Sequence, residues 1–91
     1  MNEIYEILKE YKMYVAGLEF EIKGRVLQRV ELSKERDFKW EISHYCKPHP
    51  DAVDVYIPGR ESGQTFEEAK HLLTRYMKAF TNISVKINPF Y

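Results

Sequence analysis

The stretch that decides the fold is FKWEISHYC, residues 38–46. Apolar and polar side chains alternate through it, which is the two-residue period of a strand with one covered face and one face in water. Pro48, two residues after this stretch, ends the predicted strand, because proline cannot donate to a sheet ladder. The face predicted to be covered carries Phe38, Trp40, Ile42, His44 and Cys46.

The stretch TFEEAKHLLTRYMKAF, residues 65–80, has the period of a helix instead. Thr65 and Glu68 match a capping box, in which the hydroxyl and the carboxylate each accept a hydrogen bond from a free backbone N–H at the helix start. A sheet and a helix that each have one apolar side are expected to pack together, with Trp40 buried between them. The apolar stripe of the helix consists of Phe66, Ala69, Leu72, Leu73, Tyr76, Met77 and Phe80.

The remaining patterns predict shorter elements. Apolar residues recur with helical spacing between Asn2 and Tyr11, which predicts an amphipathic helix. Residues 18–22 and 26–32 alternate like strands and predict a hairpin with a three-residue loop at 23–25; a single long bent strand is the alternative. Residues 53–57 predict another strand, and residues 83–87 a short strand or extended tail.

Together these segments predict a single α+β domain over residues 1–91. It would have an N-terminal helix, a four-stranded antiparallel meander, a longer helix packed on the same sheet face and a short C-terminal strand or extended tail. The opposite face of the sheet would be in contact with water.

Composition limits the classes of partner. Lys plus Arg number 14 and Asp plus Glu number 14, so the chain lacks the broad basic field that attracts nucleic acid or anionic lipid. No apolar run approaches the roughly 20 residues needed to span a bilayer. With Cys46 as its single cysteine the chain forms no internal disulfide, and its first residues lack the pattern of a secretory signal. We therefore expect a cytoplasmic protein without a membrane partner.

One cluster carries residue types that can do chemistry. His44, Cys46 and His49 can all ligate zinc, but their spacing matches none of the standard ligand pairs. His44 could also act as a base for Cys46, yet residues two apart on a strand are separated by roughly 6 to 7 Å, too far for a direct hydrogen bond. The sequence thus predicts no catalytic residues, no metal site and no cofactor.

The aromatic residues offer the remaining functional signal. Tyr45 and Tyr56 are predicted to lie on the open sheet face among Lys39, Glu41 and Asp54, a composition typical of protein contacts. The sequence therefore favours a small non-enzymatic domain that binds a protein or associates with itself. One alternative is a nucleic-acid-binding regulatory domain that uses the basic residues Lys39, Lys47, Arg60, Arg75 and Lys78. The other alternative is a protein that binds a small molecule or a metal.

Overall fold

The computed structural model describes residues 3–31, 37–59 and 61–91. In chain order the elements are the strands β1 (Tyr5–Met13), β2 (Ile22–Arg29), β3 (Phe38–Ile42), β4 (His44–Tyr45) and β5 (Ser62–Gly63), the helix α1 (Phe66–Lys78) and the strand β6 (Lys86–Ile87). The α+β class with an antiparallel sheet is confirmed, and the described residues contain a single helix. None of this described structure includes a helix long and apolar enough to cross a bilayer.

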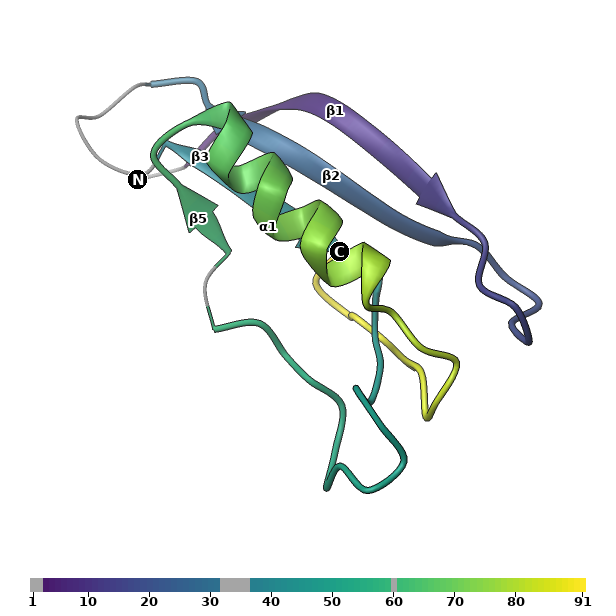
Figure 1. Ribbon diagram of the computed structural model, residues 1–91. Helices are drawn as coiled ribbons and strands as arrows, with labels where there is room; N and C mark the ends of the chain where they lie inside the picture. The colour runs from purple at the N-terminus through teal and green to yellow at the C-terminus, as the bar shows by residue number, and fades with distance from the viewer. Residues whose placement is uncertain (1–2, 32–36, 60) are drawn as a thin grey trace.

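The main sheet has the strand order β1-β2-β3-β5, with every neighbouring pair antiparallel, and α1 covers one of its faces (Figure 1). Trp40 on β3 is 2% exposed, so its predicted burial between the sheet and the helix is confirmed. Thr65 caps α1 as predicted, because its Oγ1 accepts a hydrogen bond from the Glu68 N–H at 3.1 Å. The core contains Ile22, Val26, Trp40, Ile42, Ala69, Leu73 and Met77.

The predicted N-terminal helix is wrong, since residues 5–13 form β1 and pair with β2. The register of this pair shifts between Ile7 and Lys9, which marks a bulge at Leu8. A bulge inserts one residue into the alternation, so apolar residues on either side of it acquire spacings of three and four. That spacing is also the signature of a helix, and pairing with β2 decides between the two. Asn2, the expected helix cap, lies outside the described residues.

The predicted hairpin at residues 23–25 is also wrong, and the long-strand alternative describes β2 better. β2 runs without a turn through Gly24, which pairs with Tyr11 on one side and Ile42 on the other. A Cβ at Gly24 would lie 2.7 Å from Cδ1 of Leu73. The glycine therefore permits close packing of α1 on the sheet rather than a turn. Leu32, at the end of the predicted strand, lies outside the described residues.

The predicted strand at residues 38–46 is present in two parts. β3 belongs to the main sheet, whereas β4 pairs with β6 in a separate two-stranded sheet. The strand option for residues 83–87 therefore holds only for Lys86–Ile87. The predicted strand at residues 53–57 is wrong: this stretch has no regular structure, and β5 takes the place beside β3. A simple four-stranded meander is therefore not formed.

Candidate functional site

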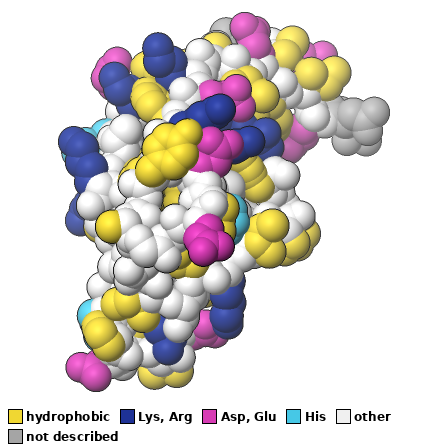
Figure 2. Space-filling view, turned by 90° about the vertical axis from the view of Figure 1, so that its right-hand side faces the viewer, with side chains coloured by type: hydrophobic (Ala, Val, Ile, Leu, Met, Phe, Trp, Pro, Cys, Tyr) yellow, Lys and Arg dark blue, Asp and Glu magenta, His cyan; other side chains and the backbone are white. Residues whose placement is uncertain are grey.

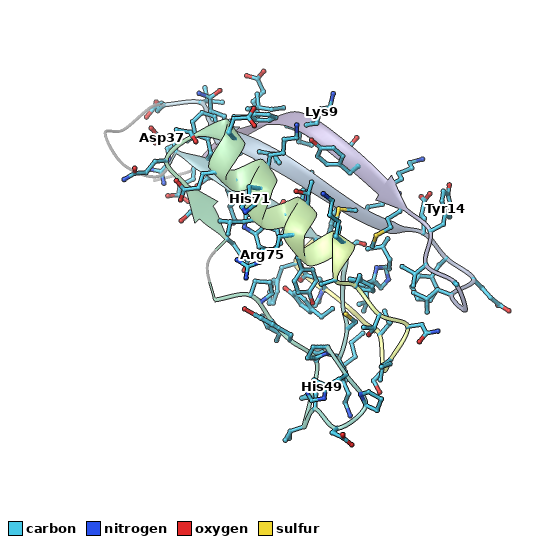
Figure 3. All side chains as sticks on the ribbon, in the orientation of Figure 1. Lys9, Tyr14, Asp37, His49, His71 and Arg75 are labelled. Carbon is cyan, nitrogen blue, oxygen red and sulfur yellow. The ribbon has the colours of Figure 1, made fainter. Side chains whose placement is uncertain are left out.

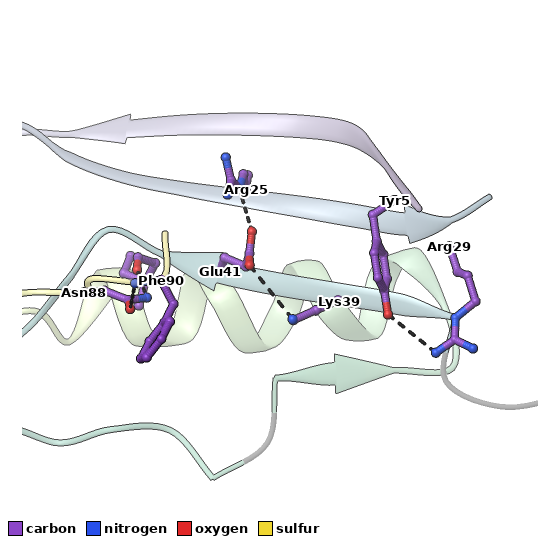
Figure 4. A network of polar contacts seen from close by, with 8 residues as sticks. Tyr5, Arg25, Arg29, Lys39, Glu41, Asn88 and Phe90 are labelled. Atoms are coloured by element: carbon purple, nitrogen blue, oxygen red, sulfur yellow. Dashed lines mark hydrogen bonds and ion pairs between the residues drawn. The ribbon is translucent and has the colours of Figure 1, made fainter. Parts of the chain in front are cut away.

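The sheet face away from α1, called the open face below, carries a row of paired charges (Figure 4). Glu41 on β3 accepts a hydrogen bond from Nε of Arg25 on β2 at 2.6 Å, and its other carboxylate oxygen lies 3.9 Å from Nζ of Lys39. Two of the predicted contact residues, Lys39 and Glu41, are thus neighbours on this face. Their charges are partly satisfied within the sheet.

Tyr5 contacts two cationic side chains at one end of the open face. The Arg29 guanidinium donates to its hydroxyl at 3.5 Å and lies 5.9 Å from its ring centre, and Nζ of Lys39 lies 5.8 Å from the same ring. Contact with Tyr5 is the main cause that raises the pKa of Arg29. Leu27, which pairs with Lys39 on this face, is only 8% exposed, so the open face also buries an apolar side chain.

The C-terminal segment covers the other end of the open face. Asn88 is 6% exposed; its side-chain N–H donates to the Ile42 carbonyl at 2.8 Å, and its Oδ1 accepts from the Phe90 N–H. The Tyr91 ring lies 4.3 Å from the Arg25 guanidinium carbon. Burial raises the pKa of Tyr91. Asn88 therefore fastens this segment to the junction of β3 and β4.

Asn88→Ala is expected to lower the free energy of unfolding by about 1 to 3 kcal/mol, because the buried Ile42 carbonyl loses its donor. Asn82→Ala is the matched control: Asn82 is exposed, although its side chain also donates to a backbone carbonyl, that of Ala16. Urea unfolding of both variants measures the difference. Equal losses would contradict the role assigned to Asn88.

The other three predicted contact residues do not join Lys39 and Glu41 on one surface. Tyr45 is half-buried against the core, where burial raises its pKa, with Glu61 and Glu41 adding to the shift. Tyr56 lies in the irregular segment before β5, and Asp54 pairs with Lys86 at 3.0 Å. The expectation that the two tyrosines share the open sheet face is corrected, because residues 53–57 are not a strand of that sheet.

A pocket of about 450 Å³ lies beside α1 and was not predicted from the sequence. Its only signals were the prolines that keep residues 48–58 out of the sheet and the tyrosine content. Arg75 points from α1 toward this side of the molecule (Figure 3). The sheet side supplies Trp40 and Cys46, the helix side supplies Leu72, Arg75, Tyr76 and Ala79, and the irregular segment supplies Pro48, Tyr56, Pro58 and Gly59.

The three residues considered as zinc ligands have separate surroundings. The His44 ring stacks on Phe20 at 4.8 Å, and burial lowers its pKa. Cys46 is buried, and its Sγ accepts a hydrogen bond from the Thr81 N–H at 3.3 Å. His49 is exposed on a loop far from α1 (Figure 3). Within the described ranges, no group of three His, Cys, Asp or Glu side chains is placed to hold a metal ion.

The basic residues considered for nucleic acid also lie apart. Lys39 is on the open face beside Glu41, whereas Arg75 and Lys78 project from α1 on the other side of the sheet. Arg60 lies outside the described residues. On the side that includes the β1–β2 loop, hydrophobic side chains alternate with both signs of charge (Figure 2).

The sequence matches no family model, and comparisons with curated proteins and with solved structures find no significant similarity.

Proposed function

We propose that this chain is a small non-enzymatic interaction domain that associates with a second copy of itself through the edge of β1. The observation that carries the proposal is the position of this strand. β1 has nine residues and lies at the edge of the sheet, and among the described residues it pairs only with β2. The outer edge of such a strand presents backbone donors and acceptors to which another strand can add.

The charges on β1 favour a second copy as that strand. Tyr11 pairs with Gly24, whose Cα lies under α1, so the neighbouring Glu10 and Lys12 point to the open face. An antiparallel pairing about a two-fold axis at Tyr11 sets Glu10 of each copy opposite Lys12 of the other. It also keeps the open faces of both sheets on the same side. Both side chains are exposed; Lys12 lies 3.8 Å from the Glu21 carboxylate, and its side chain stays 64% exposed.

The same register brings apolar surface together. Tyr14 is 78% exposed just beyond the end of β1, and it would face Leu8 of the second copy. Charged residues and the bulge make β1 a poor template for an arbitrary strand. A self-complementary register turns these charges into attractive pairs, which supports self-association over unspecific strand addition.

Glu10→Lys is expected to weaken self-association by about 1 to 3 kcal/mol, or about fivefold to 150-fold, because two attractive cross-strand pairs become repulsive. Sedimentation velocity from micromolar to millimolar protein measures the effect, with wild type expected to move from monomer to dimer. Asp51→Lys is the control, since it makes the same change in charge on an exposed turn far from β1.

Two results would contradict this proposal. Wild type that stays monomeric over the whole range would exclude self-association as the function. A dimer that Glu10→Lys and Asp51→Lys affect equally would place the contact elsewhere on the molecule.

A further inference from the structure

The pocket beside α1 has the size and lining of a site for a small aromatic molecule. Its volume of about 450 Å³ lies within the roughly 300 to 1,000 Å³ typical of small-molecule sites. Three rings line it and support one another: the Tyr76 ring centre lies 5.9 Å from that of Tyr56 and 6.1 Å from that of Trp40. A flat apolar body can contact these rings without breaking an existing hydrogen bond.

Two of the side-chain polar groups that line the pocket are already engaged within the protein. The Tyr76 hydroxyl donates to the Tyr56 carbonyl at 2.6 Å, and the Cys46 thiol accepts from Thr81. The Arg75 guanidinium, in contrast, is exposed and has no hydrogen bond or ion pair with any described residue. It is also the only charged side chain among the described residues that line the pocket.

We propose that this pocket binds a small aromatic carboxylate, with its ring among Trp40, Tyr56 and Tyr76 and its carboxylate on Arg75. The planar guanidinium offers two parallel N–H groups that match the two oxygens of a carboxylate. A single arginine balances the single charge of a carboxylate, whereas a phosphate dianion would keep excess charge beside an apolar lining. This binding is independent of the β1 edge, which lies at the far side of the sheet from the irregular segment.

Trp40 makes the proposal directly measurable. It is the single tryptophan of the chain and lines the pocket, so its indole N–H gives one NMR signal that reports on occupancy. The probes are trans-cinnamate and its neutral counterpart trans-cinnamamide, which have nearly the same shape. Both are expected to shift the Trp40 signal saturably, and cinnamate is expected to bind about threefold to tenfold more tightly.

Two variants, each with a control, distinguish the contribution of the Arg75 charge to binding from that of the aromatic rings. Arg75→Gln is expected to remove the preference for cinnamate and to leave cinnamamide binding unchanged, while Lys78→Gln, another cation of α1 that does not line the pocket, keeps the preference. Tyr56→Ala is expected to weaken both probes by about fivefold or more. Phe90→Ala removes an aromatic ring that is 87% exposed and does not line the pocket, and it leaves both affinities intact.

The absence of saturable binding by either probe would overturn the proposal. So would equal affinity for the two probes in wild type, or a preference for cinnamate that survives Arg75→Gln. Circular dichroism of each variant confirms that the fold is retained before affinities are compared.

Discussion

Trp40→Ala is expected to lower the free energy of unfolding by about 3 to 5 kcal/mol. The indole is almost fully buried on β3, opposite Val26 of β2 and against the Tyr76 ring of α1. Small domains have a total stability of about 5 to 15 kcal/mol, so this single truncation removes a large share of it. Urea or guanidinium unfolding followed by far-UV circular dichroism measures the loss.

Val53→Ala provides the control for this truncation. Val53 is 98% exposed, so its removal is expected to change stability by less than about 0.5 kcal/mol. A loss below about 1 kcal/mol in Trp40→Ala would contradict the position of the indole between sheet and helix.

Leu73→Ala is expected to lower the free energy of unfolding by about 2 to 5 kcal/mol, because this side chain has no solvent exposure and fills the space between α1 and β2.

Gly24, which lies against Leu73, allows a more specific test of this packing. Gly24→Ala alone is expected to cost about 1 to 3 kcal/mol, since the new Cβ would lie 2.7 Å from Leu73 Cδ1 and 3.1 Å from Met77 Sδ.

The losses in the free energy of unfolding caused by Leu73→Ala and Gly24→Ala are not expected to add. In the Leu73→Ala background the space beside Gly24 is partly empty, so the added methyl group is expected to cost much less than it does alone. Gly59→Ala is the control, because no atom would lie within 4 Å of its new Cβ. Strictly additive free energies of unfolding would contradict the close packing of α1 on Gly24.

Two elements could be predicted because their sequence period matches a simple structure. The helix stripe from Phe66 to Phe80 and the alternation from Phe38 to Ile42 each follow one period without interruption, and both elements are present. For the residues of β1 the sequence predicts a helix instead, because the bulge at Leu8 gives this strand the apolar spacing of a helix. Only the pairing with β2, a long-range contact, resolves the ambiguity.

Long-range packing also explains the other errors. The sequence around Gly24 predicts a turn, whereas the role of this glycine depends on Leu73, which lies far away in the sequence. Residues 53–57 alternate like a strand, but β5 occupies the position beside β3. Tyr56 accordingly lies against Tyr76 rather than on the open face, and the pocket formed there joins residues from three separate parts of the chain.

In the proposed dimer two copies pair through β1 with Glu10 opposite Lys12, and mixing two charge variants tests this register. Glu10→Lys gives a β1 with lysine at both positions, and Lys12→Glu gives one with glutamate at both. Each variant alone would place like charges opposite each other twice and should remain monomeric at concentrations where wild type dimerises. An equimolar mixture would pair lysine with glutamate at both positions.

Sedimentation velocity of the two variants, alone and mixed, is therefore the decisive measurement, after circular dichroism has confirmed that both are folded. The proposed register predicts monomers in each separate sample and a heterodimer in the mixture. A mixture that stays monomeric where wild type dimerises, or variants that dimerise separately as well as wild type does, would contradict it.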